Sequence, residues 1–196
     1  MPHVIVLAGP NGAGKTTAAG GLLRLALGVR QFVNADVIAS GLSAFQPESA
    51  ALEAGRIMLA RLRDLAAARE DFAFETTLAS RTFAPWLAKL IVEAGYEFDL
   101  YFLWLPEADM AVRRVATRVS RGGHHVDEPT VRRRYERGVL NFFSLYRPLA
   151  THWEFFDAST PGGPRRLAEG HREQQILVHD AATWDKIVQQ YDRPHP

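Results

Sequence analysis

The chain has 196 residues, of which 47% are hydrophobic and 23% are charged, and its formal net charge is +1. This length predicts a single domain, residues 1–196, with a buried core, and the near-neutral charge makes nucleic acid an unlikely partner for binding by charge alone. The sequence contains no cysteine, which excludes disulfides and thiolate metal sites.

The first predicted strand, residues 3–8, is a short apolar run that suits a buried parallel strand. Because it starts at the third residue, it leaves no room for a signal peptide. No later apolar run is long enough to span a membrane. We therefore expect a cytoplasmic protein with no membrane association.

The next segment fits the phosphate-binding loop pattern: Gly, four residues, Gly-Lys, then Ser or Thr. Glycines let several backbone N–H groups approach a phosphate, and the helix that follows directs the positive end of its dipole at the same oxygens. We expect Lys15 to bridge the β and γ phosphates and the Thr16 hydroxyl to hold Mg²⁺. The segment therefore predicts a binding site for a nucleoside triphosphate, taken as ATP, and its residues are Gly9, Pro10, Asn11, Gly12, Ala13, Gly14, Lys15, Thr16 and Thr17.

After this loop, strands and helices are predicted to alternate. A helix follows Lys15, loosened at the two glycines of residues 20–21, with apolar residues Leu22, Leu23, Leu25 and Ala26. Residues 37–48 are expected to form a loop. Later strands are predicted at 31–36, ending in an Asn-x-Asp turn, at 71–77, 98–105 and 153–157 and, briefly, near 176–178. Helices are predicted at 47–69, 82–94, 106–121, 127–146 and about 184–190. This order predicts an α/β three-layer sandwich of the P-loop NTPase class, with a mostly parallel five-stranded sheet.

Two carboxylates are expected beside the phosphates, because ligands collect at the carboxyl ends of parallel strands. Asp36 follows the second strand, where small-molecule kinases with this loop often place their acceptor, and is predicted to be the base that takes the hydroxyl proton. An Asx-turn or a helix cap is its alternative role. Glu75 ends the third strand, where it would serve Mg²⁺, bind the acceptor, or make a structural hydrogen bond; Thr77 lies two residues on.

An arginine-rich helix, a Gly-Gly break and a second arginine-rich helix predict a lid over the phosphates at about residues 118–137. Arginines flanking a hinge suit a lid that neutralises the charge that develops in phosphoryl transfer. The candidates are Arg118, Arg121, Arg133 and Arg134, with Arg121 and Arg134 expected to be catalytic. The alternative is a solvated basic face paired with neighbouring glutamates.

Four motifs in this order resemble the zeta-toxin-like family of P-loop kinases, and the resemblance covers roughly residues 3–160. The motifs are residues 8–17, 32–36, 74–77 and the arginine-rich stretch from Arg121 to Phe143. The resemblance implies an adenylate-kinase-like fold with an Arg-rich helical lid. It also implies a kinase that uses ATP and Mg²⁺ to phosphorylate the 3′-hydroxyl of UDP-N-acetylglucosamine or a similar nucleotide sugar.

By the same resemblance, Asp36 is the base, and Glu75 and Thr77 bind the acceptor. The phosphate-binding lid arginines correspond to Arg121 and to Arg133 or Arg134. The chain departs from the toxins in being shorter and in the Gly-Gly-His sequence of its lid. Three alternatives therefore stay open: a kinase of another small molecule or of polynucleotide ends, an ATPase switch without an acceptor, and a toxin covered by a protein antitoxin.

Overall fold

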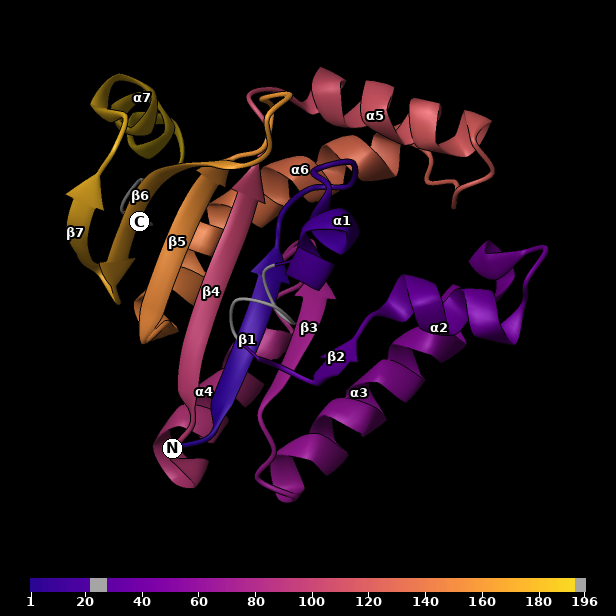
Figure 1. The fold of residues 1–196 in the computed structure, drawn as a ribbon, viewed down its shortest axis with the longest axis horizontal. Coiled ribbons are helices and arrows are strands. Elements are labelled where there is room, and N and C mark those ends of the chain that lie inside the picture. Colours follow the sequence, from indigo (N-terminus) through magenta and orange to yellow (C-terminus); the bar gives the residue numbers. More distant parts are fainter. Residues whose placement is uncertain (22–27, 193–196) are drawn as a thin grey trace.

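The computed structural model describes residues 1–21 and 28–192, and Figure 1 shows a twisted sheet with helices on both faces. The described strands form one sheet in the order β2-β3-β1-β4-β5-β6-β7. Their bounds are His3–Ala8 (β1), Gln31–Val33 (β2), Phe72–Thr76 (β3), Glu97–Trp104 (β4), His152–Asp157 (β5), Arg165–His171 (β6) and Gln174–Val178 (β7).

The first five strands are parallel, and β6 and β7 run antiparallel to their neighbours. The prediction of a five-stranded sheet is wrong, because this hairpin extends the sheet beyond β5 to seven strands. The residues of β6 read Arg-Arg-Leu-Ala-Glu-Gly-His, which lacks the apolar–polar alternation of a half-buried strand. Backbone pairing with β5, a tertiary contact, makes this segment a strand.

The described helices broadly follow the predicted alternation. Their bounds are Lys15–Ala19 (α1), Ala35–Leu42 (α2), Ala51–Ala67 (α3), Phe83–Ala94 (α4), Ala108–Ser120 (α5), Glu128–Asn141 (α6) and Ala181–Tyr191 (α7), and α6 continues as a π-helical turn over Phe142–Tyr146. The apolar residues predicted to extend the first helix, Leu22, Leu23, Leu25 and Ala26, lie outside the described residues. Among the described helices, none is both long and apolar enough to cross a membrane.

Helix α2 occupies part of the stretch that the sequence predicts to be a loop. Asn34 begins it: the side-chain Oδ1 accepts hydrogen bonds from the backbone N–H groups of Asp36, at 2.8 Å, and Val37, at 3.3 Å. Asparagine is among the best residues for this capping role. The Asn-x-Asp sequence, which predicts a turn, therefore starts a helix that places Asp36 in its first turn.

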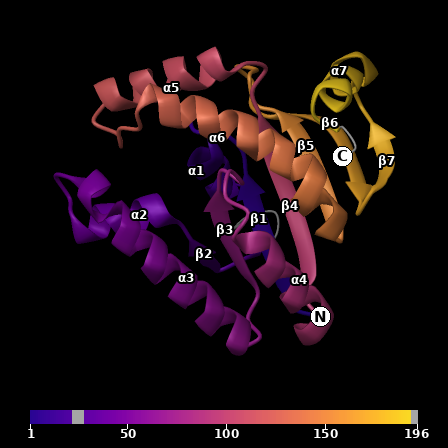
Figure 2. The same cartoon turned by 180° about the vertical axis from the view of Figure 1, so that it is seen from behind.

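Two hydrophobic clusters hold helices on opposite faces of the sheet. One joins the strands to α3, α4, α7 and the carboxyl-terminal part of α6, and the other joins the opposite face to α1, α5 and the amino-terminal part of α6. Figure 2 shows α3, α4 and α6 on the near side of the sheet in that view. Helix α6 contributes to both clusters because it passes the carboxyl ends of the central strands, where the phosphate-binding loop also lies.

Helix α6 rests directly on the backbone of the loop that follows β3. A Cβ atom added to Gly138 would lie 2.4 Å from the carbonyl oxygen of Thr77. Nearby, Asn141 Nδ2 donates to the Leu78 carbonyl oxygen at 2.6 Å and the Tyr146 hydroxyl donates to that of Ser80 at 2.6 Å. The loop after β3 is therefore fixed by α6 and its π-helical extension.

We expect Gly138→Ala to lower the free energy of unfolding by about 1–3 kcal/mol, because the new methyl group meets a backbone oxygen that cannot rotate away. Urea unfolding followed by circular dichroism measures this change. Gly41→Ala is the matched control: Gly41 also lies in a helix, and no atom lies within 4 Å of its added Cβ. Equal stability of the two variants would contradict the close contact.

Candidate functional site

The phosphate-binding loop, residues 9–14, joins β1 to α1 at the carboxyl edge of the sheet. The last residue of β1, Ala8, pairs with Thr76 of β3 on one side and with Phe102 of β4 on the other. Gly9 is required here, because its φ is +139° and an added Cβ would lie 2.2 Å from the Leu103 carbonyl oxygen. The loop therefore crosses directly over β4.

Lys15 is the buried cation of this site, with 6% of its surface exposed. Its Nζ donates to the Pro10 carbonyl oxygen at 3.0 Å and lies 3.6 Å from Glu75 Oε1. Burial lowers the pKa of Lys15 below its ordinary value, and the carboxylates of Glu75 and Asp36 partly oppose that shift. An ammonium desolvated in this way is poised to interact strongly with an anion.

Glu75 links the loop to the start of α2. Its Oε2 accepts hydrogen bonds from Thr16 Oγ1 at 2.9 Å and from Asn34 Nδ2 at 2.7 Å. Asn34 thus binds Glu75 with its amide nitrogen while its oxygen caps the helix that carries Asp36. The sequence predicts no site role for Asn34, and its only signal is a place in the Asn-x-Asp turn that ends the second predicted strand.

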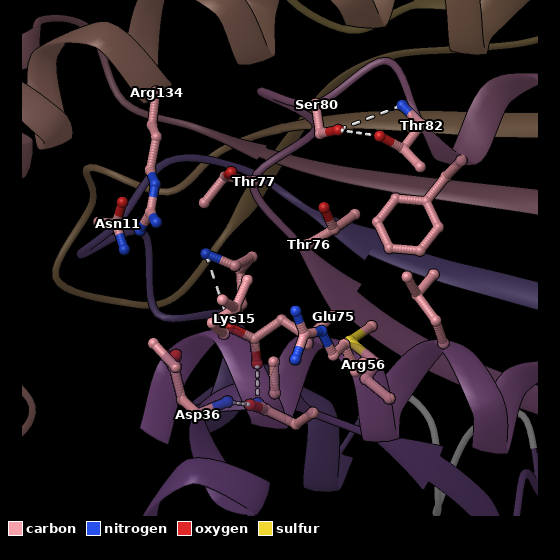
Figure 3. Close-up of a pocket in the computed structure, with 18 residues that line it drawn as sticks. Asn11, Lys15, Asp36, Arg56, Glu75, Thr76, Thr77, Ser80, Thr82 and Arg134 are labelled. Atoms are coloured by element: carbon pink, nitrogen blue, oxygen red, sulfur yellow. Dashed lines mark hydrogen bonds and ion pairs between the residues drawn. The ribbon is translucent and has the colours of Figure 1, made fainter. Parts of the chain in front are cut away.

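A cavity of about 400 Å³ opens beside these groups. Asp36 lines it from α2 and Arg134 lines it from α6, and among the described residues neither side chain has a hydrogen bond or ion pair. Figure 3 shows Arg134 reaching from its helix toward Asn11 and Lys15. Asn11 is buried, and within the described chain its Oδ1 has no hydrogen-bond partner. The cavity is therefore lined by a buried ammonium together with a carboxylate and a guanidinium that have no hydrogen-bond or ion-pair partner among the described residues.

The structure brings together six of the predicted site residues and leaves several others apart. The cavity is lined by Asn11, Lys15, Asp36, Glu75, Thr77 and Arg134. Thr16 reaches Glu75 from outside the lining. The remaining loop residues, Gly9, Pro10, Gly12, Ala13, Gly14 and Thr17, do not line it, nor do Arg118, Arg121 and Arg133.

The three arginines outside the cavity differ in their surroundings. Arg118 donates from Nη2 to the His124 carbonyl oxygen at 2.7 Å, and its charge contributes to lowering the pKa of Lys15. Arg133 donates to Thr130 Oγ1 at 3.3 Å, within its own helix. Arg121, which follows α5, is exposed. Their assignment to the phosphates stays a prediction.

Two arginines without a predicted site role also bear on the site. Arg56 of α3 lines the cavity; in the sequence it lies off the packing face of its helix, which gives no sign of a cavity beside it. Arg114 of α5 supports the phosphate-binding loop: its Nη1 lies 3.4 Å from the Gly12 carbonyl oxygen and donates to that of Ala158 at 2.8 Å. Its guanidinium is committed to backbone oxygens.

Comparison with known proteins agrees with this architecture. Residues 4–138 match a protein-family model, AAA_33, described as an AAA domain. No curated protein matches the chain by sequence.

Several solved structures are similar in fold. The crystal structure of AvrRxo1-ORF1:-ORF2 with ATP is similar at 18% identity and a TM-score of 0.71, over 95% of this chain and 63% of that chain. This chain thus spans less than two thirds of that chain. A structure of the PezAT chromosomal toxin–antitoxin system of Streptococcus pneumoniae matches at 14% identity and a TM-score of 0.64, over 97% and 78% of the two chains.

A gluconokinase from Sinorhizobium meliloti 1021 matches at 14% identity and a TM-score of 0.51, over 82% of this chain and 84% of that chain. At these identities the likeness shows a common fold, the P-loop NTPase-like α/β fold with a mostly parallel sheet. The family model covers residues 4–138, well over half of the 196 residues, so the chain belongs to the AAA domain family.

Proposed function

We propose that the chain is an ATP-dependent kinase that transfers a phosphoryl group to a hydroxyl of a small molecule. The observation that supports this most is the meeting of Lys15, Asp36 and Arg134 at one cavity of about 400 Å³. A phosphate-binding loop alone would serve an ATPase equally well. An uncommitted carboxylate facing the same cavity adds a group that can activate an acceptor hydroxyl.

In the proposed reaction, the acceptor oxygen forms a bond to the γ phosphorus while its proton passes to the carboxylate of Asp36. The bond between that phosphorus and the bridging oxygen of ADP breaks. Lys15 and Arg134 stabilise the negative charge on the transferring group, which in such reactions spreads over its equatorial oxygens. Asn11, with its buried side chain beside them, is a further polar contact for a phosphate.

Thr16 and Glu75 fit a magnesium ion. Both offer oxygen atoms, the ligands that Mg²⁺ prefers, and these atoms lie 2.9 Å apart beside the loop lysine. When bound, Mg²⁺ supplies neutralisation of phosphate charge. The contact with Thr16 supports a role for Glu75 on the metal side, whereas the resemblance to zeta toxins favours acceptor binding by Glu75 and Thr77, both of which line the cavity.

Residues 118–137, from the end of α5 into α6, are the lid in this proposal. Arg118, Arg121 and Arg133 lie on the same part of the chain as Arg134 and approach the phosphates when the lid closes. This assignment is supported by the exposure of Arg121 and Arg133, which leaves both side chains accessible to a ligand.

The zeta-toxin-like motifs support UDP-N-acetylglucosamine or a similar nucleotide sugar as the acceptor. Two of the structural neighbours also support a protein partner of the antitoxin kind. PezAT is described as a toxin–antitoxin system, and AvrRxo1-ORF1 was crystallised in complex with AvrRxo1-ORF2. We propose such a partner for this chain.

The direct test is to incubate the purified protein with MgATP and a panel of hydroxyl acceptors that includes UDP-N-acetylglucosamine, and to follow the products by mass spectrometry. A product heavier by one phosphoryl group, formed together with ADP, is the expected result. Formation of ADP and inorganic phosphate at one rate with every acceptor, and no phosphorylated acceptor, would refute the kinase in favour of an ATPase.

Replacing Arg134 with glutamine should lower kcat by about two to three orders of magnitude, because arginines that contact the transferring phosphoryl group contribute effects of at least this size. ATP affinity should change far less. Steady-state kinetics and calorimetry measure the two effects. Arg137→Gln is the control, since Arg137 is exposed on the same helix and does not line the cavity; equal losses in both variants would exclude a specific role for Arg134.

A further inference from the structure

The cavity extends beyond the groups that the proposed transfer uses. One part of its lining comes from the phosphate-binding loop and α6, and another from α3 and the segment after β3. In Figure 3, Asn11 and Arg134 lie on one side of the view and Ser80 and Thr82 on the other. In the proposed reaction ATP is held by the phosphate-binding loop and Arg134, which leaves the second part of the lining to the acceptor.

Arg56 is the cation of this second part. It projects from α3 into the lining (Figure 3), and among the described residues its guanidinium has no hydrogen bond and no ion pair, even with Asp36 or Glu75 of the same cavity. Arg61, on the same helix, instead donates to Gln31 Oε1 at 3.1 Å. An arginine that lines a cavity without a carboxylate partner is well suited to bind an incoming oxyanion through its planar fork.

The surface around Arg56 is apolar. Met58, Leu59 and Phe83 line the cavity there, and the ring of Phe83 is held at 5.0 Å from that of Phe74 in the core. Leu52 lines the same cavity with 72% of its surface exposed. Gly55 leaves room above α3, because an added Cβ would meet no atom within 4 Å. Such a wall fits a flat or apolar group of a ligand.

We propose that the acceptor is an oxyanion-bearing alcohol with a flat or apolar group, and that Arg56 binds its oxyanion while its hydroxyl lies at Asp36. This inference rests on the proposed kinase function and adds to it a specificity-determining residue. Phosphate and carboxylate are the two sources of the oxyanion. A neutral alcohol would leave the guanidinium of Arg56 without a partner in the cavity.

The test begins with binding, which needs no turnover. The protein is first saturated with a non-hydrolysable ATP analogue so that the phosphate-binding loop is occupied. Calorimetry then compares uridine diphosphate, pyrophosphate and glucuronate with the neutral compounds uridine and glucose. We expect uridine diphosphate to bind about tenfold or more tightly than uridine, or glucuronate to bind about tenfold or more tightly than glucose. This is in line with the strength of hydrogen bonds to charged groups.

In Arg56→Gln this preference for the anion should fall by about tenfold or more, and Arg56→Lys should retain part of it. Arg63→Gln is the matched control, because Arg63 is exposed on the same helix and lies outside this cavity. Both variants should unfold like the parent protein, since no described contact is lost in either. Whether phosphate or carboxylate is preferred identifies the source of the oxyanion.

Absence of anion binding to the analogue-loaded protein, or equal binding by Arg56→Gln and Arg63→Gln, overturns the inference. Phosphoryl transfer to neutral alcohols at a rate unaffected by Arg56→Gln would also overturn it while leaving the kinase intact. Conversely, Arg56-dependent anion binding without transfer to any acceptor would count against the kinase alone. The two failures are therefore distinguishable.

Discussion

Asp36→Asn should lower kcat by about two to four orders of magnitude, the range over which a positioned general base contributes to catalysis. The amide cannot accept the hydroxyl proton, whereas its size and its backbone hydrogen bond to Asn34 Oδ1 are unchanged. ATP affinity should stay within about twofold, because the loss removes an interaction made in the transition state. Rapid-quench transfer assays and calorimetry with an ATP analogue provide the two measurements.

The control for this variant is Asp64→Asn, an exposed aspartate on α3 that does not line the cavity. It should leave both quantities unchanged. Near-parental kcat in Asp36→Asn would rule out Asp36 as the base. Weaker ATP binding with unchanged kcat would instead indicate that the carboxylate acts on the nucleotide side of the site.

Lys15→Met should weaken ATP binding by about 10- to 100-fold, because a charge-assisted hydrogen bond to phosphate is lost. The stability of the free protein should respond differently. Burial disfavours the charged form of Lys15 and lowers its pKa, so an apolar side chain of similar length removes a cost that the wild-type protein carries. We expect the variant to be at least as stable as the parent at neutral pH.

The lowered pKa of Lys15 also determines how the free energy of unfolding changes with pH. When pH rises above the lowered pKa of Lys15, the folded state loses its proton before the unfolded state, which then binds more protons. The free energy of unfolding of the parent protein therefore rises with pH until the ordinary lysine pKa, at about 10.4, is reached. Lys15→Met lacks this rise, and Lys89→Met, at an exposed position, retains it. Identical pH profiles for the two variants would contradict the desolvation of Lys15.

The local and periodic features of the site could be predicted from the sequence. The phosphate-binding loop is a contiguous pattern, and Asp36 and Glu75 were expected to meet because parallel strands end at one edge. Of the edge hairpin β6–β7, the sequence predicts only a short strand near residues 176–178, because β6 lacks the apolar–polar alternation of a half-buried strand. Helix α2 was missed because its start, at Asn34, also reads as a turn.

The arginines show why the rest of the site could not be predicted. Arg132, Arg133 and Arg134 are consecutive, but a helix turns about 100° per residue, so their side chains diverge. Arg132 pairs with Asp109 and Glu128, Arg133 reaches Thr130, and only Arg134 enters the cavity. The place of Arg56 in the cavity lining depends likewise on where α3 lies relative to β3, which no local sequence pattern specifies.

Gly138 packs closely on the carbonyl oxygen of Thr77, so we expect any rotation of α6 to occur about this residue. With a rise of about 1.5 Å per residue, Arg134 lies about 6 Å along the helix from it and Glu128 about 15 Å. A tilt of about 10° would then displace the backbone of Arg134 by only about 1 Å and that of Glu128 by about 2.6 Å. A rotation of α6 about Gly138 would thus move Arg134 little and move the amino-terminal end of the helix, at Glu128, more than twice as far.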